Sequence, residues 1–196
     1  MTMSVIDVTR GRRECFLAEK AAKVMRDGGV IAYPTESCFG LGCDPNNALA
    51  VRRLLAIKCR SYRKGLILIV SNIQQCKEYA KIQKSPKHAE ILDSWPGPNT
   101  WLLPPTHKAL RLVRGQHEQI AIRMTAHPIA AAICEVFGGA IVSTSANLQR
   151  KASLKTADSV QRQFGHSLDF IVSACVGIDD KPSIIRNGLS GEILRK

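Results

Sequence analysis

Short apolar runs along this chain alternate with longer segments in which apolar residues recur every three or four positions. The first pattern is typical of buried strands and the second of amphipathic helices. Strands are predicted at 30–33, 66–70, 101–103, 119–124, 140–144, 170–172, 184–185 and 192–194. Helices are predicted at 47–57, 128–137 and 157–164, and before position 28. The alternation predicts an α/β fold with a mixed sheet covered by helices.

Local signals set several element ends. Gly28-Gly29 and Gly138-Gly139 should stop the helices that precede them. Ser85-Pro86 predicts the opening of a short helix, since Ser favours the N-cap and Pro the first helical position. Trp95-Pro96-Gly97-Pro98 predicts an irregular, stiff turn.

The chain has 196 residues, 45% of them hydrophobic, so we expect one soluble domain over residues 1–196. Its apolar runs are too short to span a bilayer, and the N-terminus lacks the charged-then-apolar pattern of a signal peptide. We therefore expect a cytoplasmic protein without a membrane partner.

The formal net charge is +12, and basic residues cluster between positions 52 and 64. A cluster of this kind indicates a polyanionic partner, which could be a nucleotide, an RNA or both. A solvated cationic face that serves solubility is an equal alternative on charge alone.

Seven cysteines are scattered without a C-x-x-C pair. An odd, unpatterned set favours reduced thiols over a disulfide framework. Cys38 and Cys43 lack a second ligand pair at zinc-finger spacing, so no protein-held metal is expected.

Candidate binding residues follow the predicted strands and one helix. Thr35 comes directly after a strand, with Gly40-Leu41-Gly42 shortly beyond it. Ligands of open α/β sheets collect at the carboxyl ends of strands, and glycines would let a ligand approach the backbone there. A turn capped by Thr35 is an equal alternative.

The sequence lacks G-x-x-x-x-G-K-[ST] and G-x-G-x-x-G, so any nucleotide must be held by side chains. Lys58 and Arg60, at a predicted helix C-terminus, can supply a point charge and a rigid fork of donors. We expect both to face a cavity, where truncation affects stability little. Their alternative role is to complement the helix dipole, which is worth about 0.3–1 kcal/mol.

A polar turn, Ser143-Thr144-Ser145-Ala146-Asn147, ends another predicted strand. No G-x-S-x-G elbow surrounds it, so a nucleophilic serine is not expected. Arg123 also lies at a strand end, where it could clamp a carboxylate bidentately, with an ordinary exposed arginine as the alternative. The five histidines are scattered, and none is assigned a catalytic role.

Eight short motifs follow one another in a characteristic order, and together they cover nearly the whole chain. They are Tyr33-Pro34-Thr35-Glu36, Phe39-Gly40-Leu41-Gly42, Lys58-Cys59-Arg60, Lys64-Gly65-Leu66, Trp95-Pro96-Gly97-Pro98, Ser143-Thr144-Ser145-Ala146-Asn147, Pro182-Ser183 and Gly191-Glu192-Ile193-Leu194-Arg195. In this order the motifs resemble the YrdC/TsaC family, especially its short, single-domain bacterial form. The chain departs from the family's usual pattern at Ser37-Cys38-Phe39, which removes one phenol, and at Gln149-Arg150.

The resemblance implies a twisted α/β sheet with a large, basic, concave cavity. It also implies an L-threonylcarbamoyladenylate synthase, a nucleotidyltransferase. That enzyme makes L-threonylcarbamoyl-AMP and pyrophosphate from L-threonine, bicarbonate and ATP, with Mg²⁺ carried by ATP. The product feeds N6-threonylcarbamoylation of adenosine 37 in tRNAs that read ANN codons. Implied partners are downstream threonylcarbamoyl-transfer proteins, with direct tRNA binding as a further option.

The resemblance also assigns site residues. It places Lys58, Arg60, Ser145 and Asn147 as catalytic residues at the ATP phosphates and the reacting carboxylate. It places Arg195 near the nucleotide, and Thr35, Arg123, Ser143 and Ser183 around threonine.

This assignment is chemically coherent, because fixed cations would neutralise the charge that builds up as a carbamate oxygen attacks the α-phosphate. The competing class is a non-catalytic RNA-binding module. The charge favours such a module, but aromatic residues make up only 5% of the chain and the RRM and KH patterns are missing.

Overall fold

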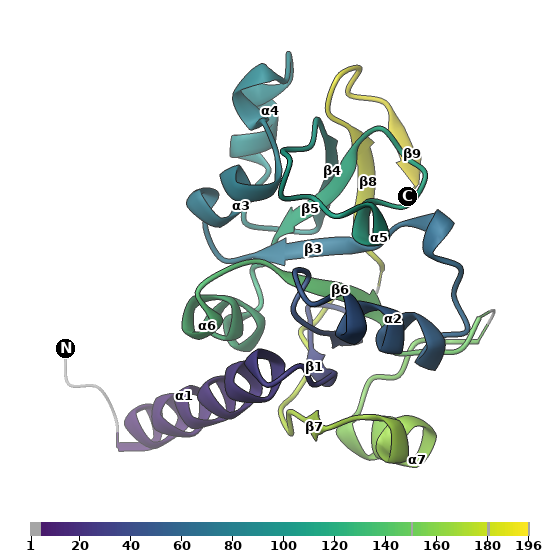
Figure 1. Cartoon of the computed structure of the whole chain (residues 1–196). Coiled ribbons are helices and arrows are strands. Elements are labelled where there is room, and N and C mark those ends of the chain that lie inside the picture. The colour runs from purple at the N-terminus through teal and green to yellow at the C-terminus, as the bar shows by residue number, and fades with distance from the viewer. Residues whose placement is uncertain (1–4, 150, 180, 196) are drawn as a thin grey trace.

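The computed structural model describes residues 5–149, 151–179 and 181–195. Helices and strands alternate along most of the chain, as the sequence predicts (Figure 1). The helices are α1 (Val5–Arg26), α2 (Ala48–Ile57), α3 (Ile73–Tyr79), α4 (His88–Asp93), α5 (Arg111–Arg114), α6 (Pro128–Phe137) and α7 (Ala157–Phe164). Short 3₁₀ turns are η1 (Tyr62–Lys64), η2 (Ile82–Lys84) and η3 (Gly165–Ser167).

The strands form one mixed sheet in the order β7-β1-β2-β6-β3-β5-β4-β8-β9. They are β1 (Ile31–Pro34), β2 (Phe39–Gly42), β3 (Ile67–Val70), β4 (Asn99–Leu103), β5 (Ile120–Met124), β6 (Ile141–Ser145), β7 (Phe170–Ile171), β8 (Ile184–Asn187) and β9 (Ile193–Arg195). Three pairs are parallel, namely β1–β7, β3–β5 and β4–β8. The other pairs are antiparallel, so the predicted mixed sheet is confirmed.

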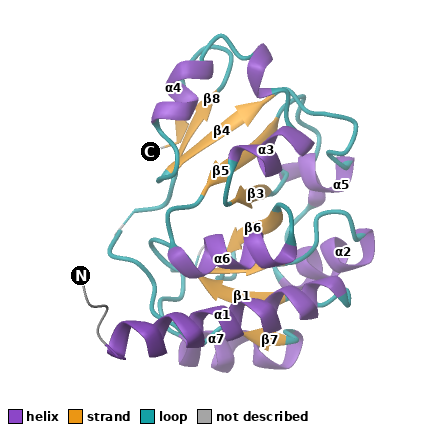
Figure 2. Ribbon diagram, turned by 90° about the vertical axis from the view of Figure 1, so that its left-hand side faces the viewer, coloured by secondary structure: helices purple, strands orange, loops and turns teal. Residues whose placement is uncertain are grey.

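The two faces of the sheet carry separate apolar clusters. Helices α1 and α6 pack on one face, where Met25 and Ile133 meet Ile31, Tyr33 and Ile141 of the strands. Helices α2, α3 and α7 contribute to the larger cluster on the other face. Figure 2 shows α1 and α6 lying side by side in front of the strands. Because side chains alternate along a strand, β1, β3 and β6 supply residues to both clusters.

Most predicted helix ends agree with the structure. Helices α6 and α7 have the predicted bounds, and α6 ends at Gly138, whose φ of 83° places it in the left-handed region that glycine tolerates. The prediction at Ser85-Pro86 is wrong by two residues, because α4 begins at His88. The Ser85 hydroxyl instead donates to the carbonyl of Gly188 and accepts from the backbone of Lys87.

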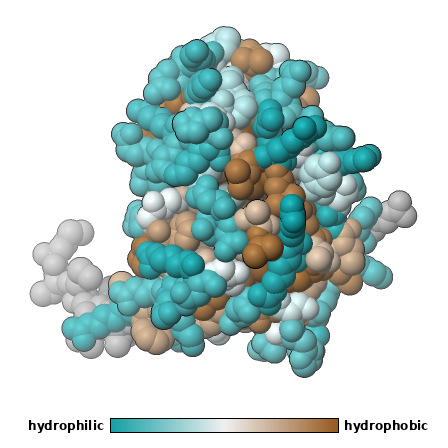
Figure 3. Space-filling view, viewed as in Figure 1, coloured by the Kyte–Doolittle hydropathy of each residue, from teal (hydrophilic) through white to brown (hydrophobic). Residues whose placement is uncertain are grey.

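Three elements were not predicted: β2, α3 and α5. Strand β2 contains Gly40 and Gly42, where a ligand is expected to approach the backbone, and it pairs with both β1 and β6. The surface of the molecule is hydrophilic over most of the face in Figure 3, with apolar groups gathered near its middle.

Candidate active site

A cavity of about 330 Å³ opens on the sheet face that carries α1 and α6. Along β6, Ile141 packs in the apolar cluster beneath these helices, while Ser143 and Ser145 line the cavity. Side chains two residues apart share one face of a strand, so a single strand passes from core to cavity wall. On β3, Ile67 and Ile69 continue the apolar floor of the cavity.

The structure brings the predicted site residues together. The cavity wall includes eight of them: Thr35, Arg60, Arg123, Ser143, Ser145, Asn147, Ser183 and Arg195. Lys58 lines an adjoining cavity of about 200 Å³, which it shares with Arg60, Ser145 and Asn147. Nine residues spread over more than 160 positions of the chain therefore surround one connected space.

Lys58 is the residue that ends α2, and its amine holds the polar turn after β6. Lys58 Nζ donates to the carbonyl of Ser145 at 2.5 Å, to Asn147 Oδ1 at 2.8 Å and to the carbonyl of Asn147. The expectation of a side chain whose truncation affects stability little is wrong for Lys58, which is 6% exposed and has three protein acceptors.

The turn is further fixed by its own side chains. Ser145 Oγ donates to Asn147 Oδ1 at 2.8 Å, and Asn147 Nδ2 donates to the carbonyl of Lys151 at 2.6 Å. The sequence departure at Gln149-Arg150 falls partly outside the described residues, because Arg150 is not among them. Gln149 lies in the wall of the smaller cavity.

The cations at this end of the cavity repel one another. Burial, and then the charge of Arg60, lower the pKa of Lys58 from 10.5 to about 8, although Cys38 acts in the opposite direction. Arg60 donates through Nε and Nη2 to the carbonyl of Gly65, at 3.3 and 2.9 Å. Burial and then Arg195 lower the pKa of Arg60, but a guanidinium stays charged in proteins.

Arg195 lies on the edge strand β9 and reaches Ser183. Its Nη2 donates to the Ser183 carbonyl at 2.8 Å and to Ser183 Oγ at 3.3 Å. Ser183 Oγ is also 2.9 Å from Thr100 Oγ1. Burial and then the charge of Arg123 lower the pKa of Arg195, so the three arginines of the wall influence one another.

Arg123 is neither exposed nor free to form a full bidentate clamp. It is 8% exposed, its Nε donates to the carbonyl of Gly97 at 3.0 Å, and its Nη2 forms an ion pair with Glu36 Oε2. Glu36 was quoted in the sequence motif without a role. The signal that could have found it is its place directly after Thr35, at the strand end where ligands collect.

Thr35 and Ser143 lie in the wall, but their hydroxyl groups have nearby protein partners. Thr35 Oγ1 donates to the carbonyl of Cys38 at 2.7 Å, which leaves its lone pairs for a ligand. Ser143 lies beside the Tyr33 hydroxyl. Burial raises the pKa of Tyr33 far above its usual value, and the hydrogen bond with Ser143 opposes this only in part.

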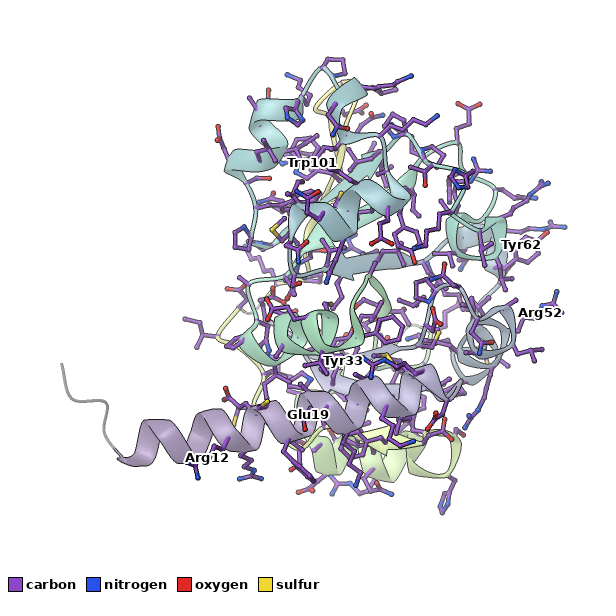
Figure 4. The ribbon with its side chains drawn as sticks, turned by 60° about the vertical axis from the view of Figure 1, so that its left-hand side comes forward. Arg12, Glu19, Tyr33, Arg52, Tyr62 and Trp101 are labelled. Carbon is purple, nitrogen blue, oxygen red and sulfur yellow. The ribbon has the colours of Figure 1, made fainter. Side chains whose placement is uncertain are left out.

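The glycines of β2 have a packing role that the sequence did not predict. A Cβ atom on Gly42 would lie 2.7 Å from the Tyr33 ring and 2.6 Å from the carbonyl of Val142. Gly40 pairs with Tyr33 in the sheet and lines the cavity. The space above Gly42 is therefore filled by Tyr33, which lies inside the molecule beside α6 and α1 (Figure 4), rather than by a ligand.

Within the described residues, no group of three or more His, Cys, Asp or Glu side chains could hold a metal ion. The cysteines of the described ranges are free, and Cys38 lies in the cavity wall. No helix of the described ranges is long and apolar enough to cross a membrane.

Residues 23–196 match the Sua5/YciO/YrdC family, which is described as "Telomere recombination". The chain belongs to this family. Its relatives include the threonylcarbamoyl-AMP synthase of Halorhodospira halophila, 47% identical over 92% of this chain and 95% of the relative. The threonylcarbamoyl-AMP synthase of Methylococcus capsulatus is 44% identical over 92% of this chain and 97% of its own length.

Solved structures of the Sua5/YciO/YrdC family have the same fold. The structure of P. abyssi Sua5 carrying H234A and Y235A has a TM-score of 0.83 and 30% identity over 90% of this chain. This chain spans 54% of that one, so it corresponds to about half of Sua5. P. abyssi Sua5 has also been crystallised in complex with L-threonine, and that structure has a TM-score of 0.80 and 31% identity.

Proposed function

We propose that this chain is a threonylcarbamoyl-AMP synthase that acts in tRNA threonylcarbamoylation. The amine of L-threonine and bicarbonate combine as a carbamate with loss of water, and a carbamate oxygen attacks the α-phosphorus of ATP. The new oxygen–phosphorus bond forms as the bond between the α-phosphorus and the bridging oxygen breaks, and pyrophosphate leaves. Mg²⁺ enters as part of the ATP substrate. The relatives are named for this synthase activity, which favours it over a non-catalytic RNA-binding module.

The observation that carries the proposal is one cavity whose two ends differ in charge. The phosphate end consists of Lys58, Arg60, Ser145 and Asn147, whose cations have no carboxylate partner among the described residues. Mobile or dispersed cations would have to reorganise, whereas these are held in place before ATP binds. Fixed charges of this kind stabilise the charge that develops during phosphoryl transfer.

The amino-acid end consists of Thr35, Arg123, Ser143 and Ser183. It offers one guanidinium for a carboxylate, and hydroxyl groups for the polar part of an amino acid. The P. abyssi Sua5 complex, in which L-threonine is bound to a related protein, supports threonine as the occupant. Arg195 lies between the two ends, and its positive charge interacts with the charges of Arg60 and Arg123.

No protein nucleophile is required by this reaction. Positioning two substrates in one cavity can supply much of the rate, because the attack becomes effectively unimolecular. Lys58 donates to the carbonyl of Ser145 and to the side-chain amide oxygen of Asn147. It therefore also fixes the turn against which the phosphates would lie. Direct tRNA binding and docking of threonylcarbamoyl-transfer proteins stay predictions.

The test is pyrophosphate release in the presence of Mg²⁺ and ATP, with threonine and bicarbonate omitted in turn. We expect release to require both, and mass spectrometry to find an acid-labile threonylcarbamoyl adenylate. Arg60→Ala should abolish release, whereas Arg12→Ala, which removes an exposed arginine of α1, should not. Release that persists unchanged without threonine would contradict the proposal.

A further inference from the structure

The Arg123 guanidinium is held on two of its three nitrogens. Nε donates to the carbonyl of Gly97 at 3.0 Å, and Nη2 is paired with Glu36 Oε2. Nη1 has no hydrogen-bond partner among the described residues, although Arg123 lines the cavity. The orientation of the guanidinium is therefore set by the protein, and only one of its nitrogens is left for a ligand.

Glu36 is itself held firmly. Its Oε1 accepts from Thr125 Oγ1 at 2.9 Å and from the backbone N–H of Ala126 at 2.8 Å. Its carbonyl accepts from the backbone N–H of Asp179 at 3.1 Å. A Cβ atom on Gly177 would lie only 2.7 Å from that carbonyl oxygen, so the chain packs closely over Glu36. These contacts fix both the carboxylate and the backbone of Glu36, so Arg123 is paired with an anchored partner.

Glu36 is also the one carboxylate in the described wall of the cavity, which contains Arg60, Arg123 and Arg195. Burial raises the pKa of Glu36, but Arg123 and the hydrogen bonds outweigh it, so the pKa lies below its usual value. Glu36 is therefore ionised at neutral pH and offsets the charge of Arg123 alone. Among the described residues, Arg60 at the other end has only the backbone carbonyl of Gly65 as its hydrogen-bond partner.

We propose that Glu36 is a positioning residue for the amino-acid substrate: it aims Nη1 of Arg123 into the cavity and adapts this end to a single carboxylate. The inference rests on the proposed function, since it takes threonine as the ligand of Arg123. Glu36 itself contacts Arg123, Thr125 and Ala126, and both of its oxygens are occupied by these contacts. It acts on threonine through Arg123.

A purely structural role is the competing explanation, because losing one partner of a buried ion pair destabilises a protein whatever its function. The two explanations differ in what they change. A structural role lowers the melting temperature and the folded fraction, without a selective effect on one substrate. A positioning role raises the KM for threonine in the folded protein and leaves the KM for ATP unchanged.

The chain offers a matched control for this comparison. Asp169 accepts from Arg53 Nη1 at 2.6 Å and from the backbone N–H of Val30 at 2.7 Å. It is therefore also a carboxylate paired with an arginine and a backbone amide, but its side chain is 36% exposed, against 11% for Glu36, and it does not line the cavity. Asp169→Asn and Glu36→Gln thus remove the same kind of group at two places.

The experiment measures threonine-dependent pyrophosphate release by the full-length chain. Glu36→Gln should raise the KM for threonine about tenfold or more, since hydrogen bonds to charged groups are strong, and should change the KM for ATP less than about twofold. Asp169→Asn should change neither KM. In protein that already carries Arg123→Ala, adding Glu36→Gln should raise the KM for threonine less than about twofold further. The effects of two residues that act through one contact are not additive.

Thr125→Val provides a second variant if Glu36→Gln does not fold. It removes one hydrogen bond to Glu36, so it should raise the KM for threonine about threefold and leave the KM for ATP unchanged. Stabilisation of the folded protein by L-threonine alone, measured as a shift in melting temperature, should be reduced in both variants. An unchanged threonine KM in folded Glu36→Gln or Thr125→Val overturns the positioning role.

The wild-type protein separates this inference from the proposed function. Wild-type protein that neither releases pyrophosphate with threonine nor is stabilised by it contradicts the proposed function, and the role of Glu36 fails with it. Wild-type protein that does both, while Glu36→Gln keeps its threonine KM or raises both KM values equally, contradicts the role of Glu36 alone.

Discussion

The two ends of the cavity both present cations, but they differ in how the protein balances them. At the phosphate end, Lys58 and Arg60 donate only to neutral oxygen atoms within the part of the chain that the structure describes. At the amino-acid end, Arg123 is paired with Glu36. The unpaired cations of the first end leave their full positive charge for a polyanion. The ion pair of the second end orients the Arg123 guanidinium and offsets its charge.

This difference affects the stability of the folded protein through different residues at the two ends. Burial and then the charge of the half-buried Arg60 lower the pKa of Lys58, so two neighbouring cations without a carboxylate repel each other. A buried ion pair avoids the repulsion but depends on both partners, because removing one leaves an uncompensated charge. Truncation of Arg60 should therefore affect activity more than stability, whereas truncation of Arg123 should affect both.

The largest effect is expected from Arg60→Ala. Removing one preorganised donor to a developing charge typically lowers kcat about 10²–10³-fold, and we expect a loss of this size here. The free energy of unfolding should fall by only about 1 kcal/mol, because Arg60 donates to the single carbonyl of Gly65. Steady-state kinetics and denaturant titration check the two numbers. Activity retained in a strongly destabilised protein would mean that Arg60 is a structural residue.

Lys58→Ala should show a comparable loss of activity together with a loss of stability. The variant leaves Asn147 Oδ1 and the carbonyls of Ser145 and Asn147 without the lysine donor, and an unsatisfied buried group costs about 1–3 kcal/mol. Hydrogen exchange should increase at residues 145–149 and not in α6. A variant with unchanged exchange in that turn would show that Lys58 does not hold it.

Arg123→Ala tests the other end of the cavity. It should raise the KM for threonine about 10–100-fold and the KM for ATP far less, since a charged hydrogen bond is lost at one substrate only. It should also lower the free energy of unfolding by about 3–5 kcal/mol, because Glu36 is left buried and unpaired. Arg123→Ala with Glu36→Gln should recover part of that stability and none of the affinity for threonine.

The apolar patterns of the sequence predicted α6 and α7 with the bounds that the structure has. A local signal also marked the end of α6, where Gly138 follows Phe137. Strand β2 has no such signal, because its four residues include two glycines and its pairing partners lie elsewhere in the chain. Its glycines are required by the ring of Tyr33, a contact that no local pattern reveals.

The same limit applies to the site. The resemblance named residues that the structure brings around one cavity, but it did not give their protein partners. Lys58 meets Ser145 across 87 positions of the chain, and Thr125 meets Glu36 across 89. Such contacts follow from the order of strands in the sheet, in which β6 lies between β2 and β3. The charged residues of the cavity were thus predictable from the sequence, whereas the protein groups that pair with each of them were not.

The smallest effect we expect is on the pH dependence of ATP binding. With a pKa of about 8, Lys58 is cationic at pH 7 and mostly neutral at pH 9. If ATP binds the cationic form, its Kd should rise up to about tenfold over this interval. The pKa of Glu36 lies below its usual value, so its carboxylate stays ionised over this interval.

Stability should change in the opposite direction, which separates weakened binding from unfolding. Because the folded-state pKa of Lys58 lies below its ordinary 10.5, the unfolded chain binds more protons between about pH 8 and 10.5. The contribution of Lys58 to the free energy of unfolding therefore increases with pH in that window. Calorimetric titration of ATP alone at pH 7, 8 and 9 measures the Kd. In Lys58→Arg, whose side chain cannot titrate in this range, the Kd for ATP should not change with pH. An equally steep rise of the Kd in that variant would assign the pH dependence to another group.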